Sequence, residues 1–283
     1  MGPTVAVVPE LLRRTVASTV HRLFSGGEER PFTEPTTDDP GPIPLDSPVR
    51  EVHRDTSMIV GGVRTLLYQT LHPDAMYGVA EHSNYESDPL GRLHRTAYFL
   101  EATVYGSADD AQQAIDVVRA IHSRVTGVLP DGRSYRADDP HLIGWVHATE
   151  LDSFLTAFQT YGPRRLDEPE VDRYIADMSV IGEALGGRDL PMNRAELCDM
   201  LAMYREECVA TPECRDTTRF LFAPQLPLPV LAVYPVIFGA ATAMLPGWAR
   251  RMLLLPLAPG VDPLVLRPAA EGLVRTLRWA APR

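Results

Sequence analysis

The chain has 283 residues, 45% hydrophobic and 23% charged, a balance typical of a globular protein with a sizeable core. All 27 basic residues are arginine, which excludes mechanisms that need a side-chain amine, such as Schiff-base formation, pyridoxal-phosphate anchoring and a Walker lysine. The formal net charge of −10 argues against a nucleic-acid partner, because phosphate backbones are bound by basic surfaces.

The first 49 residues are predicted to lie outside the main domain. Apolar residues recur near helical spacing over residues 5–24, which predicts an amphipathic helix. Residues 31–48 hold six prolines and no helical period, so we expect an extended surface loop there and a compact domain over residues 50–283. No positive charge precedes the first apolar run, and we therefore expect no secretory signal.

The rest of the chain is predicted to form a single all-α domain, a globular multi-helix bundle, because apolar residues recur at helical periods and alternating runs are almost absent. Ser107 and Asp139 are typical helix starts, and Gly106, Gly127 and Gly162 are typical helix ends. The predicted helices span residues 62–72, 73–83, 89–105, 107–126, 139–161, 167–186, 193–206, 214–221, 229–244, 247–253 and 263–280.

Residues 226–246 carry no charge over 21 residues, a length that could cross a bilayer. Prolines interrupt this segment, so we predict a buried core helix that is kinked at Pro235. Contact of this end of the chain with a membrane surface stays open as an alternative, which Trp248, Arg250 and Arg251 would favour.

Several standard types of catalytic and binding site are excluded because their sequence motifs are absent. The sequence has no glycine-rich dinucleotide or phosphate loop, no GxSxG elbow, no HExxH and no glutamate followed three residues later by histidine. Its cysteines are odd in number and lack CxxC spacing, so Cys198, Cys208 and Cys214 are expected to be reduced thiols of a cytoplasmic protein. Histidine is left as the residue type that could carry chemistry.

Two of the eight histidines lie on apolar faces of predicted helices. His122 follows Ala111 and Ile115 at helical spacing, and His147 follows Ile143 in the same way. A buried neutral imidazole is costly unless its nitrogens are hydrogen-bonded or bound to a metal. Each of the two is therefore a candidate ligand, and a hydrogen-bonded core histidine is the alternative for each.

The predicted helix 89–105 carries a candidate binding face. Arg92, Arg95, Thr96 and Phe99 follow i, i+3, i+4, i+7 spacing and share one side of this helix. The opposite side is apolar, which predicts a buried helix, and buried arginines need an anion or another acceptor. A solvated arginine face is the alternative.

Four long strings then follow one another in an order typical of a known family: GVRTLLYQTLHPDAMYGVAEHSNYESDPLGRLHRTAYFLEATVYG, VRAIHSRVTG, DGRSYRADDPHLIGWVHATELDSFLTAFQTYG and LPMNRAEL. Over about residues 58–205 the chain resembles the rubber oxygenase (latex-clearing protein) and MpaB-type oxygenase superfamily. The resemblance implies an all-α fold that encloses one b-type haem, with a histidine as the proximal iron ligand.

The resemblance also implies roles for residues on the proximal side of the haem. The family motif, roughly V-R-x-x-H-x-x-x-R, matches a stretch in which His122 would be the iron ligand and Arg119 a neighbouring haem contact. The second arginine departs from the motif, since Arg124 comes earlier than the motif requires. His147, in WVHAT, is typical of the smaller bacterial members and is the second choice as ligand or pocket residue.

On the distal side the family carries R-x-x-K-T, and Arg92, Arg95 and Thr96 occupy the matching positions, with Phe99 one turn further on. Arg95 replaces a lysine that can bind iron in the family, and a guanidinium has no lone pair to offer. We therefore expect an open or water-bound distal site. Glu81 is the nearest candidate for the catalytic glutamate described for rubber oxygenases.

Taken with the resemblance, the sequence predicts a haem b-dependent oxygenase that uses dioxygen or peroxide on an apolar or semi-polar small molecule, in secondary metabolism. The alternative is a non-enzymatic helical protein that binds an apolar carboxylate or a lipid-like ligand through Arg92 and Arg95. The sequence does not predict the oligomeric state.

Overall fold

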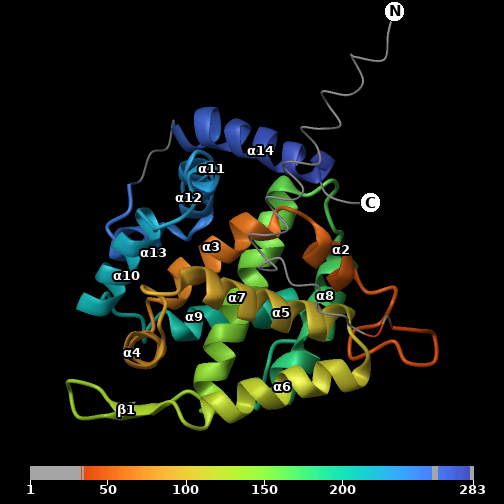
Figure 1. The fold of residues 1–283 in the computed structure, drawn as a ribbon, viewed down its shortest axis with the longest axis horizontal. Coiled ribbons are helices and arrows are strands. Elements are labelled where there is room, and N and C mark those ends of the chain that lie inside the picture. Colours follow the sequence, from red (N-terminus) through yellow and green to blue (C-terminus); the bar gives the residue numbers. More distant parts are fainter. Residues whose placement is uncertain (1–32, 34, 257–260, 281–283) are drawn as a thin grey trace, which may run out of the picture.

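The structure is a computed structural model that describes residues 33, 35–256 and 261–280. Helices dominate the fold (Figure 1), and in these ranges the only sheet is an antiparallel hairpin of Thr126–Val128 (β1) and Ser134–Arg136 (β2). The all-α prediction is confirmed, with this short hairpin as an addition. The helix predicted over residues 5–24 lies outside the described residues.

The helices follow one another along the chain as α2 (Pro48–Arg54), α3 (Met58–Gln69), α4 (Pro73–His82), α5 (Pro89–Tyr105), α6 (Ala108–His122), α7 (Pro140–Tyr161), α8 (Glu168–Ala184), α9 (Arg194–Tyr204), α10 (Pro212–Phe222), α11 (Leu228–Leu231), α12 (Tyr234–Met244), α13 (Gly247–Met252), the π-helix η1 (Asp262–Leu266) and α14 (Arg267–Ala280). Helix α2 was not expected. It begins where the proline-rich loop was predicted to end, because the Ser47 side chain caps it and Pro48 suits a first helical turn.

Local capping chemistry sets several other boundaries as predicted. The side chains of Ser107 and Asp139 each accept a hydrogen bond from a backbone N–H in the first turn of α6 and α7. Gly106 and Gly162 are the C-cap residues of α5 and α7. These four positions explain why α5, α7 and the start of α6 were predicted almost to the residue.

The hairpin corrects the prediction for the end of α6. This helix stops at His122 instead of residue 126, and Gly127 lies in β1 opposite Tyr135 of β2. A Cβ atom on Gly127 would lie 2.6 Å from the Tyr135 ring, so glycine lets the ring lie across the strand. Gly127 is therefore a packing residue of the hairpin, and it does not cap the helix.

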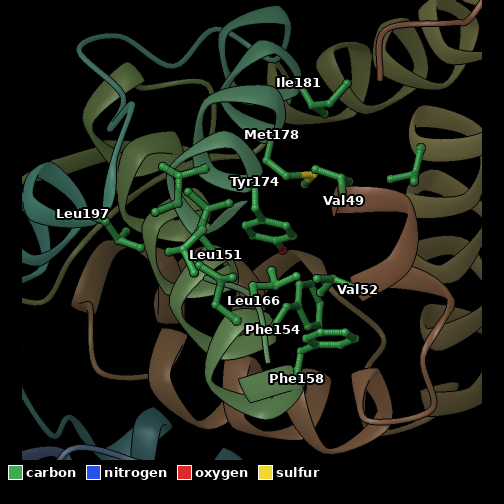
Figure 2. Close-up of a cluster of buried hydrophobic side chains, with 14 of the residues drawn as sticks. Val49, Val52, Leu151, Phe154, Phe158, Leu166, Tyr174, Met178, Ile181 and Leu197 are labelled. Atoms are coloured by element: carbon green, nitrogen blue, oxygen red, sulfur yellow. The ribbon is translucent and has the colours of Figure 1, made fainter. Parts of the chain in front are cut away.

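Helix α7 runs through the middle of the molecule and supplies much of its core. Figure 2 shows Leu151, Phe154 and Phe158 of α7 converging with Val52 of α2 and Tyr174 of α8. All five side chains are buried. The predicted apolar face of α7 is thus confirmed, and it packs against both α2 and α8.

Helix α3 packs along α7 with its backbone close to the partner helix. A Cβ atom on Gly61 would lie 2.8 Å from Cδ1 of Phe154, so only glycine fits there without movement. The buried guanidinium of Arg64 donates hydrogen bonds to the Ser153 hydroxyl and the Asp152 carboxylate of α7, both at 2.7 Å, and to the Met244 carbonyl of α12. Arg64 therefore links α3, α7 and α12.

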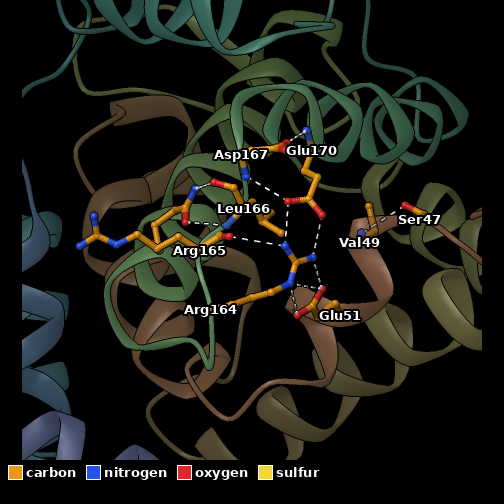
Figure 3. A network of polar contacts seen from close by, with 9 residues as sticks. Ser47, Val49, Glu51, Arg164, Arg165, Leu166, Asp167 and Glu170 are labelled. Carbon is orange, nitrogen blue, oxygen red and sulfur yellow. Dashed lines mark hydrogen bonds and ion pairs between the residues drawn. The ribbon is translucent and has the colours of Figure 1, made fainter.

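A second arginine ties α2 to the other helices at the surface. Arg164, just after α7, donates to the carboxylates of Glu51 in α2 and Glu170 in the first turn of α8 (Figure 3). Exposed ion pairs each add little stability, but this bidentate arrangement fixes the position of α2 against the α7–α8 connection.

The uncharged segment 226–246 forms two helices, α11 and α12, instead of one kinked helix. Pro235 lies in the first turn of α12, where its missing N–H costs nothing, so the proline starts a new helix. Ile237, Phe238 and Ala241 of α12 are buried, as predicted for a core helix. Within the described ranges, no helix is both long and apolar enough to cross a membrane.

Candidate active site

Helices α5 and α6 pack against each other as an antiparallel pair, joined at Gly106 and Ser107 (Figure 1). This connection brings the first half of α5, which carries Arg92 and Arg95, to the same end of the pair as the last turn of α6, which carries His122. The predicted proximal and distal residues are thus placed at one end of one helical pair.

His122 is half-buried in the last turn of α6. Its Nδ1 is buried and has no hydrogen-bond partner among the described residues. Burial holds the pKa of His122 below its ordinary value, although Asp138 acts in the opposite direction, so the imidazole is neutral near pH 7. A neutral imidazole with an unpartnered nitrogen is suited to metal ligation. Arg119, one turn earlier, is exposed.

His147 is buried between α7 and α8, as the helical spacing predicted. Its Nε2 lies 3.4 Å from the Ser179 hydroxyl, which donates to the Pro191 carbonyl. A Cβ atom on Gly182 would lie 3.0 Å from Nδ1, so protein atoms also enclose the other side of the ring. Burial lowers the pKa of His147 to about 4. These contacts are typical of a packed core histidine.

The two arginines of α5 differ in their surroundings. Arg92 is half-buried, donates to the Ser83 hydroxyl at 3.0 Å, and forms no ion pair with a carboxylate in the described part of the chain. Burial lowers the pKa of Arg92 from its ordinary value. Arg95 is 61% exposed and pairs with Asp88 at 3.3 Å. Thr96 is also exposed, and its hydroxyl donates to the Arg92 carbonyl.

The prediction that this helix is buried on both sides is therefore wrong for Arg95 and Thr96. The reason lies in the tertiary packing, because α5 contacts α6 and α2 while its first half keeps a solvent-facing side. Phe99, further along α5, is partly buried and packs against the core cluster that contains Tyr174.

Glu81 is exposed at the end of α4 and is held by the hairpin that follows His122. The Tyr135 hydroxyl donates to the Glu81 carboxylate at 2.5 Å. Burial, and then the neighbouring Glu81 carboxylate, raise the pKa of Tyr135 above its ordinary value. Glu81 thus accepts a hydrogen bond from a neutral phenol.

The structure adds a titratable group that the sequence reasoning missed. Glu150 is half-buried in the middle of α7, and burial raises its pKa to about 7. No side chain in the described ranges pairs with it. Its charge acts on Tyr174 of α8, whose hydroxyl lies 3.2 Å from Nε2 of His53. The sequence does carry one indication of this group. Glu150 comes three residues after His147, so both lie near the same side of a largely apolar helix.

A hollow of about 380 Å³ lies between the end of α4, the following loop and α10. Ser83, the partner of Arg92, lines it together with Tyr85, and its other lining residues include Glu86 and Asp216. The lining contains neither His122 nor His147. This acidic hollow is separate from the candidate iron ligands.

A family model described as "ER-bound oxygenase mpaB/B'/Rubber oxygenase, catalytic domain" matches residues 50–279. The chain belongs to this oxygenase family. The match confirms the resemblance found in the sequence and extends it to residues 50–279, and it supports an oxidoreductase enzyme. No curated protein and no solved structure matches the chain.

Proposed function

We propose that this oxygenase-family protein is a haem b-dependent oxygenase in which His122 holds the iron. The observation that carries the proposal is the state of His122: a neutral, half-buried imidazole with an unpartnered nitrogen, at the same end of the α5–α6 pair as Arg92. His147 fits the group less well, because Ser179 and Gly182 enclose its ring. When bound, the haem would supply an iron that reacts with dioxygen or peroxide.

Arg92 would bind an anionic group of the cofactor or substrate. A half-buried guanidinium without a described carboxylate partner favours an incoming anion such as a haem propionate, because charge-assisted hydrogen bonds are strong where water is partly excluded. Arg95 contributes less, since it is exposed and already paired with Asp88. Neither arginine can replace the lysine ligand of the family, because a guanidinium has no lone pair to offer.

Glu150 would act as a proton donor and acceptor beside Tyr174. A carboxyl with a pKa near 7 can both hold and release a proton at neutral pH, which is the property required of a general acid or base. Glu81 is less suited to this role, because it is exposed and accepts a hydrogen bond from Tyr135.

The substrate would be an apolar or semi-polar small molecule of secondary metabolism, oxidised in the cytoplasm. Leu93 of α5 is partly buried and directly follows Arg92, so it would suit contact with an apolar ligand held by that arginine. The non-enzymatic alternative uses the same helix, with Arg92 holding a carboxylate ligand and no haem.

Haem uptake by protein from haem-supplemented cells tests the proposal. Wild type is expected to show a Soret band and about one haem per chain, His122→Ala to lose or shift the band, and His147→Gln to retain it, with far-UV circular dichroism as the folding control. Wild-type protein that incorporates no haem would overturn the oxygenase proposal. Colourless protein carrying an apolar carboxylate would instead support the non-enzymatic alternative.

A further inference from the structure

Three segments far apart in the sequence bring His72, His141 and Glu207 together at the first turn of α7. The Glu207 carboxylate lies 2.9 and 3.0 Å from Nε2 of His141 and 3.3 Å from Nε2 of His72. One ligand atom from each residue lies within 4.8 Å of the others. We propose that these three side chains form a binding site for a divalent transition metal ion such as Zn²⁺.

The donor set is one that zinc prefers. Two imidazole nitrogens and one carboxylate form the three-ligand pattern of zinc sites that keep a fourth position open for water. His72 is 5% exposed, and burial disfavours its charged form, so its ring would offer a lone pair instead of a positive charge. Without an ion, Nε2 of His72 donates to the Glu207 carboxylate. A bound ion would replace the proton on Nε2, and Nδ1, which has no partner among the described residues, could carry the N–H instead.

The backbone around the cluster places its ligands before any ion arrives. His72 is the N-cap of α4, and His141 lies in the first turn of α7, where its carbonyl accepts a 2.5 Å hydrogen bond from the Tyr204 hydroxyl. Glu207 follows α9, and its N–H donates to the Tyr204 carbonyl. The Tyr204 ring also lies 4.7 Å from the His141 ring. Tyr204 thus holds two of the three ligands, and such preorganisation favours binding.

Access and charge also suit a cation. The side chains of His141 and Glu207 are 46% and 38% exposed, so an ion can enter from solvent and keep a water ligand. Asp74 adds a second negative charge near His72. The nearby cation Arg133 is 62% exposed and pairs with Asp74 and Asp131, so it leaves the Glu207 carboxylate oxygens to the imidazoles.

A bound ion would join the start of α4, the start of α7 and the α9–α10 connection. Its ligands share no residue with the proposed haem contacts, so the two proposals stand or fall separately. Hydrogen bonds among the three side chains without an ion are the alternative, and a Zn²⁺ titration separates this case from a metal site.

The test is a titration of EDTA-treated, dialysed full-length protein with Zn²⁺ against a chromophoric chelator, in a Cys198→Ser background that removes the exposed thiol. We expect one ion per chain, with affinity at least about tenfold weaker in His141→Ala and in Glu207→Gln. The matched controls are His82→Ala and Glu206→Gln, which change exposed residues outside the cluster and should leave the affinity unchanged.

Co²⁺ gives a second readout, because imidazole and carboxylate ligation produces visible absorption bands that only the intact cluster should show. Circular dichroism establishes that each variant is folded. Absence of Zn²⁺ binding by the folded Cys198→Ser parent, or equal affinity in this parent and its His141→Ala variant, would overturn the metal site.

Discussion

Replacing Glu150 with glutamine removes a carboxyl group whose proton is held by burial in α7. Burial raises its pKa from 4.5 to about 7. Between these pH values the folded chain keeps a proton that the unfolded chain has released. The proton therefore stabilises the fold fully below about pH 4.5, and this contribution is lost as the pH rises through about 7.

The size of this contribution to stability follows from the difference between the pKa values of Glu150 in the folded and the unfolded chain. The full contribution is about 3 kcal/mol, of which about 2.5 kcal/mol is lost between pH 5 and pH 8. His53 and His147 act in the opposite direction, because burial lowers their pKa values to about 3 and about 4, so their contribution to stability rises with pH up to about 6.5. Wild type and Glu150→Gln both contain these histidines, so the difference between their free energies of unfolding depends on the carboxyl of residue 150 alone.

Urea unfolding of wild type and Glu150→Gln at pH 5 and pH 8 measures this difference. We expect the free energy of unfolding of wild type, relative to the variant, to fall by about 2.5 kcal/mol from pH 5 to pH 8. A relative stability that changes by less than about 0.5 kcal/mol would refute a carboxyl that titrates near neutral pH, and with it the proposed proton transfer by Glu150.

Two further predictions use pairs of matched variants. Arg92→Gln should release haem to an acceptor protein at least about tenfold faster than Arg95→Gln does, because Arg92 is the half-buried cation without a described carboxylate partner. The opposite order of release rates would contradict this role of Arg92. Gly61→Ala should lower the free energy of unfolding by about 1–3 kcal/mol, since its Cβ would lie 2.8 Å from Phe154. Gly62→Ala is the control, because its Cβ meets no atom within 4 Å, and it should be neutral or stabilising. Equal effects of the two variants in urea unfolding would contradict this packing.

The sequence predicted those parts of the fold that depend on neighbouring residues. Caps at Ser107 and Asp139, and the apolar face of α7, are local features that act over one or two turns. The hairpin was missed because its strands have three residues each, too few for an alternating pattern to stand out. Pro235 was read as a kink because sequence alone does not show whether a proline interrupts a helix or begins one.

The candidate site was predicted less completely, because burial and pairing there depend on distant segments. Helical spacing placed His147 in the core, but the hydrogen-bond partner of its ring is Ser179, which comes 32 residues later in the chain. The exposure of Arg95 and the raised pKa of Glu150 both follow from how helices pack. His72 and Glu207 are 135 residues apart in the sequence, so no local sequence motif predicts that they lie together.

Iron ligation by His122 is tested most directly by chemical rescue. His122→Gly removes the imidazole, and we expect the variant to lose the wild-type Soret band and to regain it when free imidazole is added, while His147→Gly keeps the band without imidazole. A wild-type Soret band in His122→Gly without imidazole, or a band that imidazole restores only in His147→Gly, would contradict ligation by His122.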